Sequence, residues 1–274
     1  MNRIIRSLSC ALLLLPAVAP AQLLPLDVDV TGDTATVRVG SSVAPLLDMR
    51  LDFDDAEGLT PASLGIDADI VATAAGPLLA RLGSGQVSIP SGLPVLLTVQ
   101  PPTLGGLRFE RRVHVEVHTH ALPYTAGSRF RLFKAPLGGA FRDVTTAVEP
   151  GSVRTRGTTG GFSQFVVVYD LRPTGTVVAQ KFAWLRDRVD RLSPSEAGPL
   201  RGRLEDIEAA VAAGDWPAAA SGIAAFRDRV ATRAGVQIPE TWSADGSTAN
   251  HAGELLAGLD TLEFSIGYLR DFGS

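Results

Sequence analysis

The feature that most restricts the fold of this chain is a change in hydrophobic periodicity near Pro173. Before this point, short runs rich in β-branched residues alternate between polar and apolar, with Gly, Pro, Asp or Ser between the runs. After it, apolar residues recur every three or four positions. A period of two is typical of strands and a period of 3.6 of helices. The sequence therefore predicts a β domain over residues 22–172 and an α-helical domain over residues 173–274.

The β domain is predicted to be an all-β sandwich of the immunoglobulin-like class, built from about nine short strands. The clearest alternation lies in residues 34–39 and 47–53, and the longest strand in 107–121. The other expected strands are 66–72, 86–89, 95–99, 129–133, 152–157 and 163–169. In a sandwich, one face of each strand is buried between the sheets, so we expect the polar residues to face outward.

The helical domain is predicted to be a small antiparallel four-helix bundle. Its apolar stripes run over residues 178–192, 200–211, 223–230 and 255–269. Ser193 and Glu196 have the spacing of a capping box, with Pro194 at the first helical position. Only the connection over residues 236–246 is long.

The first 21 residues have the organisation of an export signal. Two arginines precede an apolar run, which ends in the small-residue pattern Ala19-Pro20-Ala21. The run is shorter than the roughly 20 residues that span a bilayer, so we expect cleavage and a mature chain without a transmembrane segment. Cys10, the only cysteine, lies in this signal, so the mature chain forms no internal disulfide. We expect a bacterial protein that is periplasmic or secreted.

Two parts of the chain resemble known modules. Residues 130–133 (Phe-Arg-Leu-Phe), 141–145 (Phe-Arg-Asp-Val-Thr) and 160–165 (Gly-Gly-Phe-Ser-Gln-Phe) resemble the closing strands of β-sandwich modules of exported bacterial proteins. Residues 200–269, with Gly-Asp-Trp at 214–216, resemble the FIMAH domain, a helical module of secreted bacterial proteins. The second resemblance implies binding to surfaces or polymers. The matching residues are mostly apolar, so the resemblance implies no functional residue in this chain.

One strand carries candidate metal ligands. Val113 and its alternate neighbours form the apolar face of residues 107–121, and the polar residues of the opposite face are His114, Glu116, His118 and His120. Neighbouring side chains on such a face lie about 6–7 Å apart, so His118 and His120 can bind one metal ion. Glu116 or His114 is the expected third ligand. The alternative is an ordinary solvated face of mixed charge.

An acidic run offers a second possible metal site, formed by Asp48, Asp52, Asp54, Asp55 and Glu57. Several carboxylates suit Ca²⁺, but their spacing does not match the D-x-D-x-D-G loop. Asp48, Asp52 and Asp54 also fit the outward face of a strand, and residues 55–58 the turn that ends it.

The three tryptophans, Trp184, Trp216 and Trp242, are candidate ligand-binding residues because Trp stacks on sugars and anchors interfaces. The alternative is packing, with Trp216 and Trp242 closing the ends of the bundle and Trp184 partly buried.

Motifs of nucleophilic, metalloprotease and nucleotide sites are absent from the sequence, so no cofactor is expected. A formal charge of −4 without a basic run argues against nucleic acid as a partner. We expect a non-enzymatic exported protein of the cell envelope with a binding, adhesion or scaffolding role, whose partner is envelope polysaccharide or another envelope protein. The alternative is a metal-dependent hydrolase that uses the His/Glu-bearing strand face.

Overall fold

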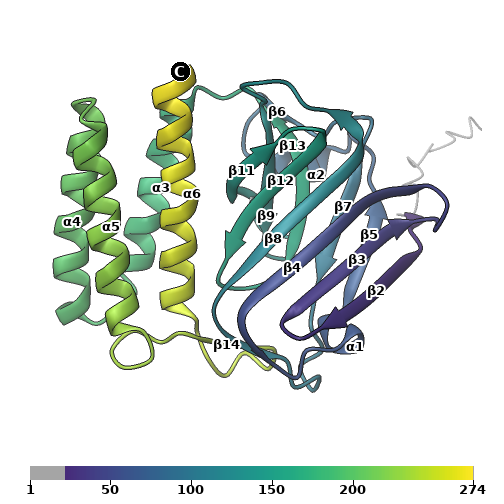
Figure 1. Ribbon diagram of the computed structural model, residues 1–274, viewed down its shortest axis with the longest axis horizontal. Coiled ribbons are helices and arrows are strands. Elements are labelled where there is room, and N and C mark those ends of the chain that lie inside the picture. Colours follow the sequence, from purple (N-terminus) through teal and green to yellow (C-terminus); the bar gives the residue numbers. More distant parts are fainter. Residues whose placement is uncertain (1–21, 274) are drawn as a thin grey trace, which may run out of the picture.

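The computed structural model of the protein describes residues 22–273, in which two antiparallel sheets lie beside four long helices (Figure 1). The export signal expected at residues 1–21 lies outside the described residues. The change in periodicity near Pro173 coincides with the change from strands to helices, since the last long strand ends at Asp170 and the first long helix begins at Thr174.

Sheet A has seven strands, in the order β1-β5-β7-β13-β9-β10 with β6 beside β13. Their bounds are β1 Gln22–Leu23, β5 Ile66–Ile70, β6 Val87–Ser88, β7 Val95–Val99, β9 Phe130–Ala135, β10 Arg142–Asp143 and β13 Gln164–Asp170. Strands β7, β9 and β13 are buried on both faces, which explains the apolar runs of β7 and β13, while β9 also contains the buried cations Arg131 and Lys134. One face contacts the other sheet, and the opposite face is covered by the short helix α2 (Gly76–Arg81) and nearby loops.

Sheet B also has seven strands, in the order β11-β12-β8-β4-β3-β2 with β14 beside β8. Their bounds are β2 Leu26–Thr31, β3 Thr34–Gly40, β4 Pro45–Glu57, β8 Arg108–Pro123, β11 Thr145–Glu149, β12 Ser152–Thr159 and β14 Thr241–Ser243. The expected turn at residues 55–58 is wrong. A register shift between Phe53 and Asp55 lets β4 continue to pair with β8 as far as Glu57, and α1 (Pro61–Leu64) follows.

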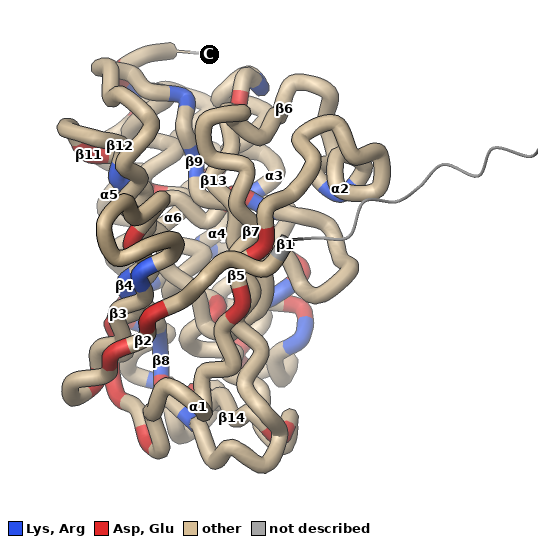
Figure 2. Tube along the Cα trace, turned by 90° about the vertical axis from the view of Figure 1, so that its right-hand side faces the viewer, with Lys and Arg blue, Asp and Glu red and all other residues tan. Residues whose placement is uncertain are grey.

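The two sheets face each other across one hydrophobic core. Val37, Met49 and Val115 of sheet B share this core with Leu97 and Phe165 of sheet A. The alternation expected in sheet B is present, because the apolar residues point into this core and the polar residues between them point outward. Acidic residues also occur on β2 and β5, on the side away from the helices (Figure 2).

The four long helices are α3 (Thr174–Val189), α4 (Pro194–Ala212), α5 (Trp216–Arg233) and α6 (His251–Phe272). They enclose a separate hydrophobic core. None of the helices within residues 22–273 is long and apolar enough to cross a membrane.

The expected capping box at the start of α4 is wrong. The Ser193 side chain makes no capping hydrogen bond, and its hydroxyl lies beside that of Ser195. Glu196 is 3% exposed and forms ion pairs with Arg229 and Arg233 of α5. The carboxylate is therefore used between two helices and does not reach back to the helix start.

Helix α6 lies against β8, β11 and β12 (Figure 1). One close contact is at Arg111, a residue of β8 with a φ of 57°. The Arg111 carbonyl accepts a hydrogen bond from the side chain of Asn250. Gly253 of α6 lies so close to the same carbonyl that a Cβ at this position would collide with it. The backbone N–H of Arg111 donates to the carbonyl of Glu240. A distorted residue of the sheet is thus the point at which the last helix is attached.

Candidate functional sites

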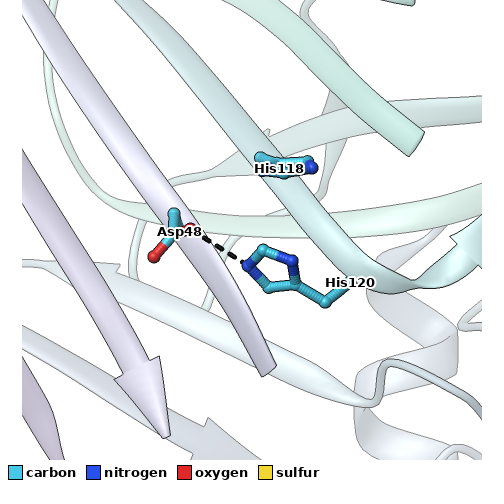
Figure 3. Close-up of side chains that lie close together, drawn as sticks. All are labelled: Asp48, His118 and His120. Carbon is cyan, nitrogen blue, oxygen red and sulfur yellow. Dashed lines mark hydrogen bonds and ion pairs between the residues drawn. The ribbon is translucent and has the colours of Figure 1, made fainter. Parts of the chain in front are cut away.

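The outer face of β8 brings two of the expected metal ligands together. His118 and His120 lie with their ring centroids 4.6 Å apart. The third group beside them is Asp48 of β4, whose Oδ2 is 3.0 Å from Nε2 of His120 (Figure 3). One possible ligand atom from each of these three residues lies within 4.8 Å of the other two. We refer to Asp48, His118 and His120 as the His-Asp cluster.

The two expected third ligands are engaged elsewhere. Glu116 accepts hydrogen bonds from Arg154 and Arg156 of β12, at 3.1 Å and 2.6 Å. Nε2 of His114 lies 3.3 Å from a carboxylate oxygen of Asp54. The outward orientation of all four side chains is as expected, but only His118 and His120 converge.

The acidic run on β4 is divided among separate basic partners. The pairs are Asp48 with Arg38, Asp52 with Arg50, and Asp54 with Arg112. Partial burial acts to raise the pKa of Asp54, but hydrogen bonds from His114 and Arg112 hold that pKa below its usual value. These three carboxylates thus each have their own cation, and Glu57 pairs with Arg108. Of the acidic run, Asp48 alone belongs to the His-Asp cluster.

His118 is held in place by the hydroxyl of Ser152, which lies 2.8 Å from its Nε2. Partial burial lowers the pKa of His118, and the nearby positive charge of Arg154 lowers it further. A lowered pKa keeps the imidazole neutral at pH 7, which is the form that binds metals.

A second candidate site is a cleft of about 750 Å³ between sheet A and the helices. It is bordered by residues at the ends of β7 and β9, by β10, by α3, by β14 and by the start of α6. Its charged and aromatic lining residues are Lys134, Arg142, Arg188, Arg191, His251, Glu254, Phe141, Phe162, Trp184 and Trp242. We refer to this feature as the cationic cleft.

Two of the three candidate ligand-binding tryptophans line this cleft. The ring of Trp184 lies beneath the guanidinium of Arg142 at 4.0 Å and within 5.0 Å of that of Arg188. Trp242 stacks on Phe109 at 5.1 Å because β14 pairs with β8. It therefore packs on the core between the sheets, not at an end of the helices as expected. Trp216 packs on the helical core and does not line the cleft.

The cations of the cleft outnumber the carboxylates. Buried Lys134 donates hydrogen bonds only to uncharged acceptors, the Thr159 hydroxyl and the Gly161 carbonyl. Burial, reinforced by the positive charge of Arg142, lowers the pKa of Lys134 to about 7. Glu254, the one carboxylate in the lining, pairs with Arg188 at 3.1 Å.

The guanidinium of Arg142 has no directly bound carboxylate among the described residues. Among residues 22–273, no ion pair or hydrogen bond involves its guanidinium, which instead stacks on Trp184. Burial lowers the pKa of Arg142 to about 10. The negative charge of Glu254 opposes this change, and the positive charge of Arg188 adds to it. A guanidinium of this kind can take up a carboxylate or phosphate group from a ligand.

Sequence reasoning missed Lys134 and Arg142. One signal was present, because Lys134 and Lys181 are the only lysines among the chain's 25 basic residues. Both lysines are buried. Lys181 pairs with Asp143 at 3.0 Å and also donates to the Thr261 carbonyl and the Ser265 hydroxyl of α6. Lys181 of α3 thus joins sheet A to α6, whereas Lys134 lines the cationic cleft.

Comparison with known proteins identifies one family and no characterised relative. The sequence model of DUF6689, described as a family of unknown function, matches residues 9–270. No curated protein and no solved structure matches the chain.

Proposed function

We propose that this chain, which belongs to the family of unknown function DUF6689, is a non-enzymatic exported protein of the cell envelope that binds acidic saccharide in the cationic cleft. The observation that carries the proposal is the position of Arg142, a partly buried cation without an ion pair among residues 22–273, stacked on Trp184 at the cleft wall. A desolvated charge without a partner is costly, and an anionic ligand would relieve that cost.

The composition of the cleft favours a sugar acid over other anions. Trp184 and Trp242 offer aromatic surface for a sugar ring, while Arg142 and Lys134 offer donors for its carboxylate. A volume of about 750 Å³ is within the range of small-ligand sites and accommodates a few sugar units.

The interpretation of the fold supports a binding role. We interpret the two sheets as an immunoglobulin-like sandwich and the four helices as a small bundle. The resemblance of residues 200–269 to the FIMAH domain, and the signal expected in residues 1–21, are consistent with an exported protein that binds polymers. In this interpretation the cleft at the junction of the two parts receives envelope polysaccharide, and another envelope protein is the alternative partner.

The metal-dependent hydrolase is less well supported. This hypothesis requires four residues of β8. Two of them have other partners, because His114 contacts Asp54 and Glu116 accepts hydrogen bonds from two arginines of β12. The remaining two lie on the outer face of sheet B, away from the cationic cleft, whose lining includes neither. We therefore favour binding over hydrolysis.

The test is titration of the purified protein with glucuronic acid oligosaccharides and with matched neutral glucose oligosaccharides, followed by calorimetry and tryptophan fluorescence. We expect the acidic series to bind and the neutral series to bind at least tenfold more weakly. Arg142→Gln is expected to weaken acidic binding at least tenfold. Arg38→Gln, which removes the same charge from the outer face of sheet B, is expected to have no effect.

Equal binding of acidic and neutral sugars would contradict the proposal. So would unchanged binding in Arg142→Gln. A thermal melt of each variant separates loss of binding from loss of folding, and Trp184→Phe, which keeps an aromatic ring in the cleft, should weaken binding less than Arg142→Gln.

A further inference from the structure

We propose that the His-Asp cluster on the outer face of sheet B is a binding site for a divalent transition-metal ion, with Zn²⁺ as the typical occupant. This site is separate from the cationic cleft and does not depend on the proposed saccharide binding. It combines residues from two adjacent strands, and neither strand alone contains the complete set of ligands.

The pairing of β4 with β8 creates the geometry. Asp48 lies directly opposite His118 in the antiparallel register, and His120 follows two residues later on the same face. The imidazole of His120 points at the Asp48 carboxylate (Figure 3). The 3.0 Å between Nε2 and Oδ2 is close to the ~3.3 Å separation expected between two ligand atoms bound at ~2.0 Å to a tetrahedral ion. Small side-chain rotations of the His118 ring would complete the third contact.

The donor set selects the class of metal. Two imidazole nitrogens and one carboxylate oxygen suit Zn²⁺, Cu²⁺ or Ni²⁺, whereas Ca²⁺ and Mg²⁺ require a shell made almost entirely of oxygen. The side chain of His120 is 34% exposed, so solvent can occupy the remaining coordination positions. Three protein ligands with an open position are sufficient for an ion of this class.

Neighbouring side chains position the ligands. The Ser152 hydroxyl, from β12, holds the ring of His118 at 2.8 Å. Arg38 lies 3.5 Å from Oδ1 of Asp48, which leaves Oδ2 directed at His120. Hydrogen-bonded partners of this kind fix ligand orientation in known metal sites.

The rest of the same strand provides an internal comparison. His114 also lies on the outer face of β8 and also contacts an aspartate, Asp54. Among residues 22–273, however, His114 belongs to no group of three possible metal ligands. An ordinary solvated face requires only isolated pairs such as this one. At Asp48, by contrast, two imidazoles have a possible ligand atom within 4.8 Å of one carboxylate, and this convergence distinguishes a metal site from such a pair.

The first experiment measures Zn²⁺ affinity by competition with a chromophoric chelator, in a Cys10→Ser background that removes the only thiol. We expect one ion per chain with a Kd of about 1–100 μM, in keeping with three partly exposed ligands. His118→Ala, His120→Ala and Asp48→Ala should each weaken binding at least tenfold. His114→Ala and His251→Ala remove the other two of the chain's four histidines and should leave the affinity unchanged.

The second experiment locates the ion directly. In an NMR titration with Cu²⁺, the ring signals of His118 and His120 should broaden before those of His114 and His251. Ca²⁺ should change none of the four.

A Kd weaker than about 1 mM would overturn the proposal. So would Zn²⁺ binding that survives in the double variant His118→Ala/His120→Ala, or equal broadening of all four histidines. A thermal melt of each variant identifies those that unfold at a lower temperature. Such a variant is replaced by the milder His118→Gln or His120→Gln.

Discussion

Two regions of this molecule contain ion pairs in opposite surroundings. On the outer face of sheet B, Arg156 and Glu116 form an ion pair whose side chains are 46% and 18% exposed. Where sheet A meets the helices, Lys181 and Asp143 form a pair that is 8% and 3% exposed. Both pairs are short, at 2.6 Å and 3.0 Å. The difference lies in access to water.

Access to water determines what each pair contributes. Water screens the outer pairs, so their partners can be exchanged with little effect on the fold. At the buried junction each charge depends on its partner, because neither can be solvated when the other is removed. The outer pairs therefore contribute little to stability, whereas the buried pair helps to fix the position of the helices on the sheet.

The largest effect is expected at the buried pair. Asp143→Asn keeps an acceptor for the backbone N–H of Thr145 but leaves the Lys181 ammonium without its anion. We expect a loss of about 3–5 kcal/mol in the free energy of unfolding, measured by urea denaturation. The double variant Asp143→Asn/Lys181→Met should recover much of this loss. A loss below about 1 kcal/mol in the single variant would mean that water reaches the pair.

The next effect is a pH dependence caused by Lys134. Its pKa is about 7 in the folded protein against 10.5 as the ordinary value, so above pH 7 the unfolded chain holds a proton that the folded protein lacks. Stability contributed by this residue should therefore rise between these two pH values, by up to about 1.4 kcal/mol per pH unit, and level off below pH 7.

Lys134→Met removes this titration. The stability gained by the variant over the wild type should be greatest at pH 7 and below. It should shrink as the pH rises toward 10, because removing the proton that the unfolded wild-type chain still holds then costs less. Denaturant titrations at several pH values test this. Burial lowers the pKa of Lys181 to about 8, although the negative charge of Asp143 opposes this change. Lys181 is present in both proteins, so its titration cancels in the comparison. A gain that is constant with pH would contradict the expectation.

The smallest effect is expected on the outer face. Arg156→Gln removes contacts to Glu116 and Glu149, both from sheet B. We expect the free energy of unfolding to fall by less than about 1 kcal/mol and the difference to shrink in high salt. A loss as large as that of Asp143→Asn would remove the distinction between the two regions.

The sequence predicts the outer face better than the junction, for a physical reason. Alternation along β8 places His118 and His120 outward because successive side chains in a strand point to opposite faces. It cannot supply Asp48, because the pairing of β4 with β8 is a property of the whole sheet. Lys134 follows Phe133 in β9 and Arg142 follows Phe141, and no local pattern indicates that both lie at the cleft beside the helices.

Trp242 illustrates a further limit. It lies in the long connection between α5 and α6, where the sequence has neither a strand nor a helix period. The three residues of β14 are too few to produce a recognisable alternation, yet they pair with β8 and place the indole on Phe109. Short strands of this kind are defined by the neighbour that they join, and that neighbour is distant in sequence.

The attachment at Arg111 has a consequence for folding kinetics. The Asn250 side chain that bonds its carbonyl comes from 139 residues further along the chain, and Glu240, which accepts from its N–H, is almost as distant. Contacts between such distant residues form slowly, because a long loop must close before they yield any stabilisation. We therefore expect β8 to acquire these partners after it has paired with β4 and β12, which lie much nearer to it in the sequence.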